Sequence, residues 1–129
     1  SPCMAFVLKQ SSSYLWPVTI EIPTDGGRHD KQTFDAELRR LPQSRIIEIQ
    51  DAVQKRLSAI QRDLETDGMI TDQEIADEIL VGWAGVNDTD GEPIPFSEKA
   101  KAELLDVPTV TASIVTAYFS SLQGAKRKN

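Results

Sequence analysis

Cysteine and histidine are almost absent from this chain. Its 129 residues include one cysteine, Cys3, and one histidine, His29. A single cysteine forms no disulfide within the chain, and one cysteine with one histidine is too few for the usual zinc sites. His29 lies beside Asp30 in a polar turn, with no serine or cysteine placed for it to activate. We therefore expect neither an enzyme nor a cofactor-binding protein. Cys3 precedes Met4, so residues 1–3 are interpreted as an expression scar.

Long apolar runs and an excess of basic residues are also missing. No apolar run approaches the ~20 residues of a membrane span, and the short run at residues 5–8 continues at once into polar residues, unlike a signal peptide. The net charge is −6, and the tail Lys126–Lys128 holds three of the fourteen basic residues. The remainder has 11 basic and 20 acidic residues, a charge of −9. We expect neither a membrane nor a nucleic acid as a partner.

Residues 4–41 are predicted to be rich in β-structure. Two segments alternate apolar and polar residues, the pattern of a half-buried strand. Their apolar positions are Val18, Ile20 and Ile22 in the first segment and Phe34, Ala36 and Leu38 in the second. The turn signal at residues 24–27 predicts an antiparallel hairpin with a loop of about seven residues. Pro17 should lie at a sheet edge or at the start of its strand, and Phe6–Lys9 is predicted to add a third strand.

Residues 44–123 are predicted to be helical. Steps of three and four residues between apolar positions predict a first helix over residues 44–66, capped by Ser44 and ended by Gly68. The apolar positions are Ile46, Ile49, Val53, Leu57, Ile60 and Leu64. Thr71 and Glu74 match a capping box, which predicts a second helix over residues 72–81.

Two further helices are predicted after the second. Ser97 should cap a helix that runs to about Leu105, and Pro108 fits the first turn of a fourth helix that ends at Gly124. The fourth helix presents Val110, Ile114, Tyr118 and Leu122 at four-residue steps. The whole chain, residues 1–129, is therefore predicted to be one α+β domain: an N-terminal β-hairpin or small antiparallel sheet, about four helices, and a basic tail at residues 124–129.

The segment Leu80–Phe96 joins the second and third predicted helices. It holds three of the seven glycines and two of the seven prolines, so no helix runs through it. Trp83 lies near one end and Phe96 at the other, which predicts a connector that packs against the domain. An aromatic-bounded connector without a nucleophile favours a role in protein interaction.

Residues 63–74 allow a different interpretation, a calcium-binding loop of the EF-hand type. Oxygen-bearing side chains occupy the ligand positions, with glycine at the sixth position. The ligands would be Asp63, Glu65, Asp67, Thr71 and Glu74. Against this interpretation, Leu64 would be exposed in such a loop, and no second loop follows. The helix end and the capping box account for the same residues, so the calcium-binding module is the alternative function.

Four stretches of the chain resemble the tail assembly chaperones of long-tailed, lambdoid (siphovirus-type) bacteriophages and prophages. They are Trp16–Pro23 (WPVTIEIP), Lys31–Pro42 (KQTFDAELRRLP), Val81–Ser97 (VGWAGV through GEPIPFS) and Ala117–Asn129 (AYFSSLQGAKRKN). The resemblance implies a non-enzymatic factor that coats the tape measure protein, keeps it soluble and recruits tail tube subunits. It also implies action in the cytoplasm of the bacterial host, absence from the mature virion, and a longer product made by frameshifting near residues 124–129.

The resemblance defines no partner surface residue by residue. We select the aromatic residues Trp83, Phe96, Tyr118 and Phe119 as candidate contacts, because adjacent Tyr118 and Phe119 cannot share one helix face. An acidic, largely helical protein suits a client with apolar helical stripes and basic segments. Self-association is expected of a protein that coats another.

Overall fold

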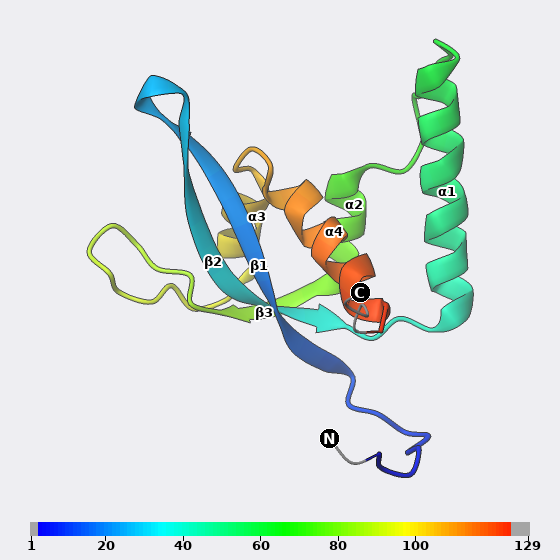
Figure 1. The fold of residues 1–129 in the computed structure, drawn as a ribbon, viewed down its shortest axis with the longest axis horizontal. Helices are drawn as coiled ribbons and strands as arrows, with labels where there is room; N and C mark the ends of the chain where they lie inside the picture. The colour runs from blue at the N-terminus through cyan, green and yellow to red at the C-terminus, as the bar shows by residue number, and fades with distance from the viewer. Residues whose placement is uncertain (1–2, 125–129) are drawn as a thin grey trace, which may run out of the picture.

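The computed structural model describes residues 3–124 and has α+β architecture, as predicted (Figure 1). Strands β1 and β2 form a long hairpin, and a third strand and four helices follow. Their bounds are β1 (Ser13–Thr24), β2 (Arg28–Arg39), α1 (Gln43–Gln61), α2 (Asp72–Ile79), β3 (Leu80–Ala84), α3 (Glu98–Leu105) and α4 (Val110–Leu122).

The sheet is antiparallel in the order β1-β2-β3. Pairing in the hairpin runs from Ser13↔Arg39 to Thr24↔Arg28, so only the three-residue turn Asp25–Gly27 remains between the strands. The predicted seven-residue loop is therefore too long. Two adjacent glycines with positive φ make the tighter turn, a conformation that glycine adopts at little cost. Pro17 lies in edge strand β1, as predicted.

The third strand is β3, and the prediction that Phe6–Lys9 would fill this place is wrong. α2 ends at Ile79 and the chain continues as a strand beside β2, from Asp35↔Ala84 to Leu38↔Leu80. The predicted extension of the second helix to Val81 is wrong for the same reason. Gly82 suits the strand because the Glu37 side chain lies across it, and a Cβ atom there would require the carboxylate to move and would lie 3.2 Å from Glu37 Cβ. Ser13 donates its hydroxyl proton to that carboxylate at 2.6 Å.

The core lies between one face of the sheet and the helices α2 and α4. The alternating residues that we expected to share a face are buried together, except that Ile22 is only half-buried. The buried cluster includes Val18, Ile20, Phe34, Ala36, Leu38, Ile75, Ile79, Leu80, Val110, Ile114 and Tyr118. Leu122, at the end of the predicted stripe on α4, is exposed. Burial of apolar side chains from both layers is the main stabilising term of such a fold.

Helix α1 differs from its prediction at both ends. It begins at Gln43 after Pro42, without a side-chain cap from Ser44. It ends at Gln61, because Asp63 takes the left-handed conformation (φ 56°) and the amide of Leu64 donates to the Ala59 carbonyl at 2.8 Å. This reversal is a Schellman motif, and it replaces the end that we predicted at Gly68. Arg56 donates to the carbonyl of Ile70 at 2.7 Å, which holds the returning chain beside the helix.

Of the other three predicted helix starts, two are confirmed and one is wrong. The capping box is confirmed, since the Glu74 amide donates to Thr71 Oγ1 at 3.1 Å and the Thr71 amide donates to Glu74 Oε1 at 2.9 Å. Ser97 caps α3 by accepting from the Ala100 amide at 3.0 Å. Pro108 does not enter α4, because the short link from α3 places Thr109 in the left-handed region (φ 73°) before the helix begins.

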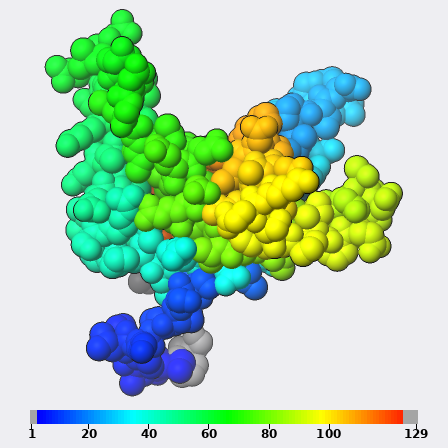
Figure 2. All heavy atoms as spheres, turned by 180° about the vertical axis from the view of Figure 1, so that it is seen from behind, coloured from blue at the N-terminus to red at the C-terminus, as the bar shows by residue number. Residues whose placement is uncertain are grey.

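Three parts of the chain extend from the packed centre (Figure 2). They are the distal end of α1 with the turn after it, the hairpin tip with the loop after β3, and the N-terminal segment before β1. The accessible surface is 9680 Å², whereas a compact monomer of this mass exposes about 6,800 Å². The chain thus offers more surface to partners than its size requires.

Candidate functional site

The aromatic pair at the connector forms one corner of the domain. Trp83 extends from β3, its indole N–H donates to the Ile94 carbonyl at 2.8 Å, and its ring meets Phe96 edge-to-face with centroids 4.9 Å apart. The loop between them is closed by the Asn87–Pro93 bridge. The connector therefore packs as predicted. Both rings are half-buried and contribute to the core, while their role as partner contacts stays a prediction.

Tyr118 lies in the centre of the fold. It is fully buried, its hydroxyl donates to the Arg39 carbonyl at 2.8 Å, and it accepts from the Leu41 amide at 3.2 Å. Burial raises the pKa of this phenol above its ordinary value, because the phenolate would lose its hydration. No partner reaches Tyr118 in this conformation. Its neighbour Phe119 is half-buried, so it is the member of this pair with exposed surface.

Ion pairs fix the helices around α2. Arg45 on α1 donates to both carboxylate oxygens of Glu78, at 2.9 and 2.8 Å. The hydrogen bonds from Arg45 hold the pKa of Glu78 below its ordinary value. Lys101 on α3 is buried and donates to the Asp77 carbonyl at 2.7 Å. Sequence reasoning missed these pairs, because their members are more than twenty residues apart and on different helices.

The alternative calcium loop finds no support in this geometry. Glu74 accepts from the amide of Thr71, and Asp72 pairs with Arg56 at 3.1 Å. Asp63 occupies the left-handed position that ends α1. Within residues 3–124, no three histidine, cysteine, aspartate or glutamate side chains are grouped so that they could hold a metal ion.

An exposed apolar stripe runs along the distal half of α1. Alternating steps of four and three residues join Ile46, Gln50, Val53, Leu57 and Ile60 on α1, the spacing of a seam that packs against another helix. Leu64 follows in the turn just after the helix. The apolar residues in the first part of this seam are covered, since Ile46 is buried and Val53 packs against the core, while Gln50 between them is exposed. Beyond it Leu57, Ile60 and Leu64 are 49%, 59% and 53% exposed. We call these three residues the distal stripe.

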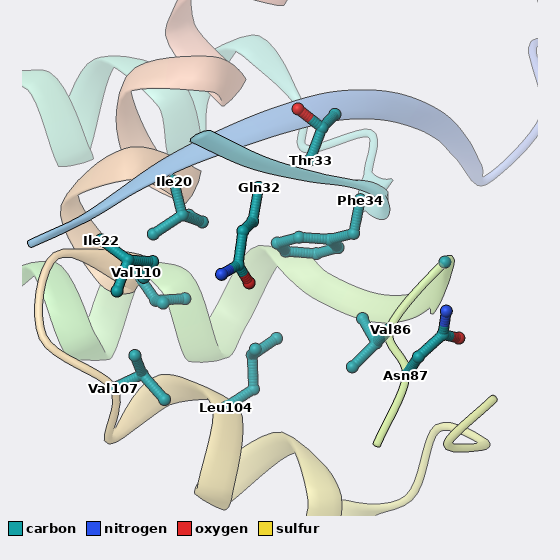
Figure 3. A pocket seen from close by; sticks show the side chains of 11 residues that line it. Ile20, Ile22, Gln32, Thr33, Phe34, Val86, Asn87, Leu104, Val107 and Val110 are labelled. Carbon is teal, nitrogen blue, oxygen red and sulfur yellow. The ribbon is translucent and has the colours of Figure 1, made fainter. Parts of the chain in front are cut away.

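A second apolar surface is a groove under the hairpin (Figure 3). Ile20, Ile22 and Phe34 extend toward it from the hairpin, and Leu104 and Val107 approach from the other side. The groove has a volume of about 210 Å³. We call it the hairpin groove. Its walls are mainly aliphatic, so it suits an apolar side chain and offers no set of groups for acid–base chemistry.

Comparison with known families identifies the chain. A family model described as phage tail assembly chaperone matches residues 4–129. The chain belongs to the phage tail assembly chaperones. No curated protein and no solved structure is similar enough to this chaperone to count as a match.

Membership agrees with the kind of surface that the chaperone presents. A chaperone acts by binding other proteins in tail assembly, and the chain exposes apolar surface on a helix and in a groove. Among the helices of the described residues, none is long and apolar enough to cross a bilayer. The basic residues Lys126–Lys128, where the resemblance places the frameshift, lie outside the described part of the chain.

Proposed function

We propose that this chaperone binds the tape measure protein of its phage without catalysis, and that the distal stripe of α1 receives a helix of that client. The observation that supports this proposal is the seam on α1. Its apolar residues are covered in the first part and exposed from Leu57 onward. A tape measure protein is long and helical, with apolar stripes that need cover until the tube forms around it. Two helices that each carry apolar residues at alternating steps of three and four residues can pack against each other along these seams.

One flank of the stripe is uncharged, so this flank does not select a client helix by its charge. Gln54 and Gln61 flank it on one side and carry no charge. Apolar contact then supplies the attraction, while the acidic remainder of the chain keeps the complex soluble and favours basic segments of the client. We further propose that the bound chaperone recruits tail tube subunits in the host cytoplasm and is absent from the mature virion.

Co-expression with the tape measure protein tests the proposal. The double substitution Leu57→Asp with Ile60→Asp places two charges on the stripe, and we expect tape measure recovery in the soluble complex to fall at least about tenfold. Ser58→Asp is the control for an added charge, because it places one aspartate in the same turn of α1 on another face. Equal recovery with the double variant and the control would reject the distal stripe as the client site.

The product pattern of the native gene tests the wider assignment. Expression with the downstream DNA, followed by mass spectrometry, should show a minor longer product that shares this N-terminus and diverges near residues 126–129. Adding purified tail tube protein to the chaperone–tape measure complex should then yield a ternary complex. If only the short product forms and the tube protein does not bind, frameshifting and recruitment are both rejected.

A further inference from the structure

We propose that two copies of this chain exchange their N-terminal segments, each inserting into the hairpin groove of the other. We call residues 4–9 the arm. In the structure the arm precedes β1, is not part of the sheet and extends away from the domain (Figure 1). The proposal concerns self-association and does not depend on the client or on the distal stripe.

The arm has the pattern of a strand without the burial of one. Met4, Phe6 and Leu8 alternate with smaller or polar residues and are 86%, 82% and 87% exposed. In an extended conformation these three side chains lie on one face. Soluble monomers rarely expose a group of large apolar side chains of this kind, and such groups mark interaction sites.

The hairpin groove lies beside a sheet edge that a strand can join. β3 pairs with β2 only from Asp35 to Leu38, and no other described strand pairs with β2 residues 28–34 on that side. Gln32, Thr33 and Phe34 line the groove at this edge. A strand added here gains main-chain hydrogen bonds, and its alternate side chains face the groove. Phe6 and Leu8 are two residues apart, so both would face the groove in an added strand.

Charge also favours the arm as the occupant. Lys9 is the one charged residue of residues 3–12. The loop that leaves the groove at Asn87 carries Asp88, Asp90 and Glu92, all exposed. A cationic end on an apolar segment is therefore attracted to this mouth of the groove.

The arm is directed away from its own groove. The Arg40 amide donates to the Ser12 carbonyl at 2.9 Å, which holds the base of the arm at the start of β1. The groove contacts β1 at Ile20 and Ile22, roughly 23–30 Å further along the strand at the usual rise per residue. Filling its own groove would require the arm to reverse at its base, whereas the groove of a second copy requires no reversal.

The area is sufficient for a stable dimer. Each large apolar side chain removes about 60–120 Å² from water when buried. The three such residues on the face that meets the groove, with a similar area from the groove, give about 360–720 Å² per arm. Two reciprocal arms give about 700–1,400 Å², which reaches the size of specific protein–protein interfaces.

Sedimentation velocity over a range of concentrations tests the exchange on the full chain. We expect a monomer–dimer equilibrium whose dissociation constant rises about hundredfold in Phe6→Asp, tenfold for each of the two arms. Ala5→Asp adds the same charge to the alternate face of the arm and should change the constant little. Val107→Asp, in the groove, should act like Phe6→Asp.

Cross-linking identifies the occupant directly. A photoreactive benzoylphenylalanine replaces Phe6, and the labelled chain is mixed with an isotopically heavy copy before irradiation. Cross-links from the light chain to groove residues of the heavy chain are expected. A chain that is monomeric at every concentration, a dimer unchanged by Phe6→Asp, or cross-links confined to the same chain would each overturn the proposal. Leu57→Asp with Ile60→Asp should leave the dimer intact, so failure here is distinct from failure of the client site.

Discussion

Replacing Tyr118 with phenylalanine removes one oxygen atom from the centre of the fold and leaves the ring in place. That oxygen joins α4 to the link between β2 and α1, because it donates to the Arg39 carbonyl and accepts from the Leu41 amide. Tyr118 is fully buried, so its hydroxyl is not exposed to solvent. The substitution therefore tests whether one hydroxyl holds the connection between the sheet and the first helix.

The magnitude follows from the two hydrogen bonds. A backbone group that loses its partner away from water costs about 1–3 kcal/mol, and the apolar contacts of the ring are kept. Because both groups lie near the edge of the core, we take the lower half of this range for each. We expect the free energy of unfolding to fall by about 2–4 kcal/mol, against a total of about 5–15 kcal/mol for a typical domain. The corresponding fall in Tm is about 10 °C.

Urea unfolding followed by tryptophan fluorescence and circular dichroism measures this loss. Tyr14→Phe is the matched control, because it removes the same atom from a half-buried tyrosine whose hydroxyl lies 2.6 Å from Ser121 Oγ. Ser121 also donates to the Tyr118 carbonyl and stays paired, so the control should lose less than about 1 kcal/mol. Equal losses in Tyr118→Phe and Tyr14→Phe would refute the bridging role.

An alkaline titration adds an independent measurement. The pKa of Tyr118 is raised in the folded state, so above pH 10 the unfolded chain releases this proton and the folded chain keeps it. The unfolded state then binds fewer protons, and stability falls as the pH rises. Tyr118→Phe should remove this part of the slope. A slope that is the same in both proteins would show that Tyr118 does not titrate as a buried group.

The remaining predictions concern the sheet, the ion pair and the loop after α1. Gly82→Val should lower the free energy of unfolding by about 1–3 kcal/mol in a denaturant titration, because a carboxylate side chain fills the space above it, whereas exposed Ala84→Val should be neutral. Pairing with Arg45 lowers the pKa of Glu78 in the folded state, so the stability that the pair contributes is present above pH 4.5 and is lost as the pH falls through this lowered pKa. The difference in stability between the wild type and Glu78→Gln should therefore vanish in acid. Thr71→Ala should cost about 1 kcal/mol through the lost cap, with an equal fall in Tm in millimolar calcium and in chelator; a larger fall in calcium would restore the calcium-binding interpretation.

Local patterns predicted the elements that depend on neighbouring residues. The hairpin faces follow from strict alternation, which places every second side chain on the same side of a strand. The capping box at Thr71 and Glu74 and the cap at Ser97 follow from hydrogen bonds between residues three positions apart. These signals are satisfied within one turn or one strand, so the remainder of the fold has little power to override them.

The errors lie where a segment had two local solutions. Leu80 and Val81 continue the apolar pattern of α2, yet they leave the helix to pair with β2. The arm at residues 4–9 has the pattern of a strand, but β3 takes the position beside β2. Tyr118 lies on the buried face of α4, which the sequence did not indicate, because helix spacing shows which residues share a face but not which face the sheet covers.

The sequence alone determined the α+β class, the hairpin, the starts of α2 and α3 and the packed connector, because alternation, capping and turn preference act over a few residues. It also carried the resemblance that the family match confirms. The tertiary structure decided which strand completes the sheet, where α1 stops, and which part of its apolar seam stays exposed. Those outcomes depend on pairs of residues far apart in the chain, such as Arg45 with Glu78 and Tyr118 with Leu41. No local pattern encodes them, since each is settled only when the competing segments meet in one core.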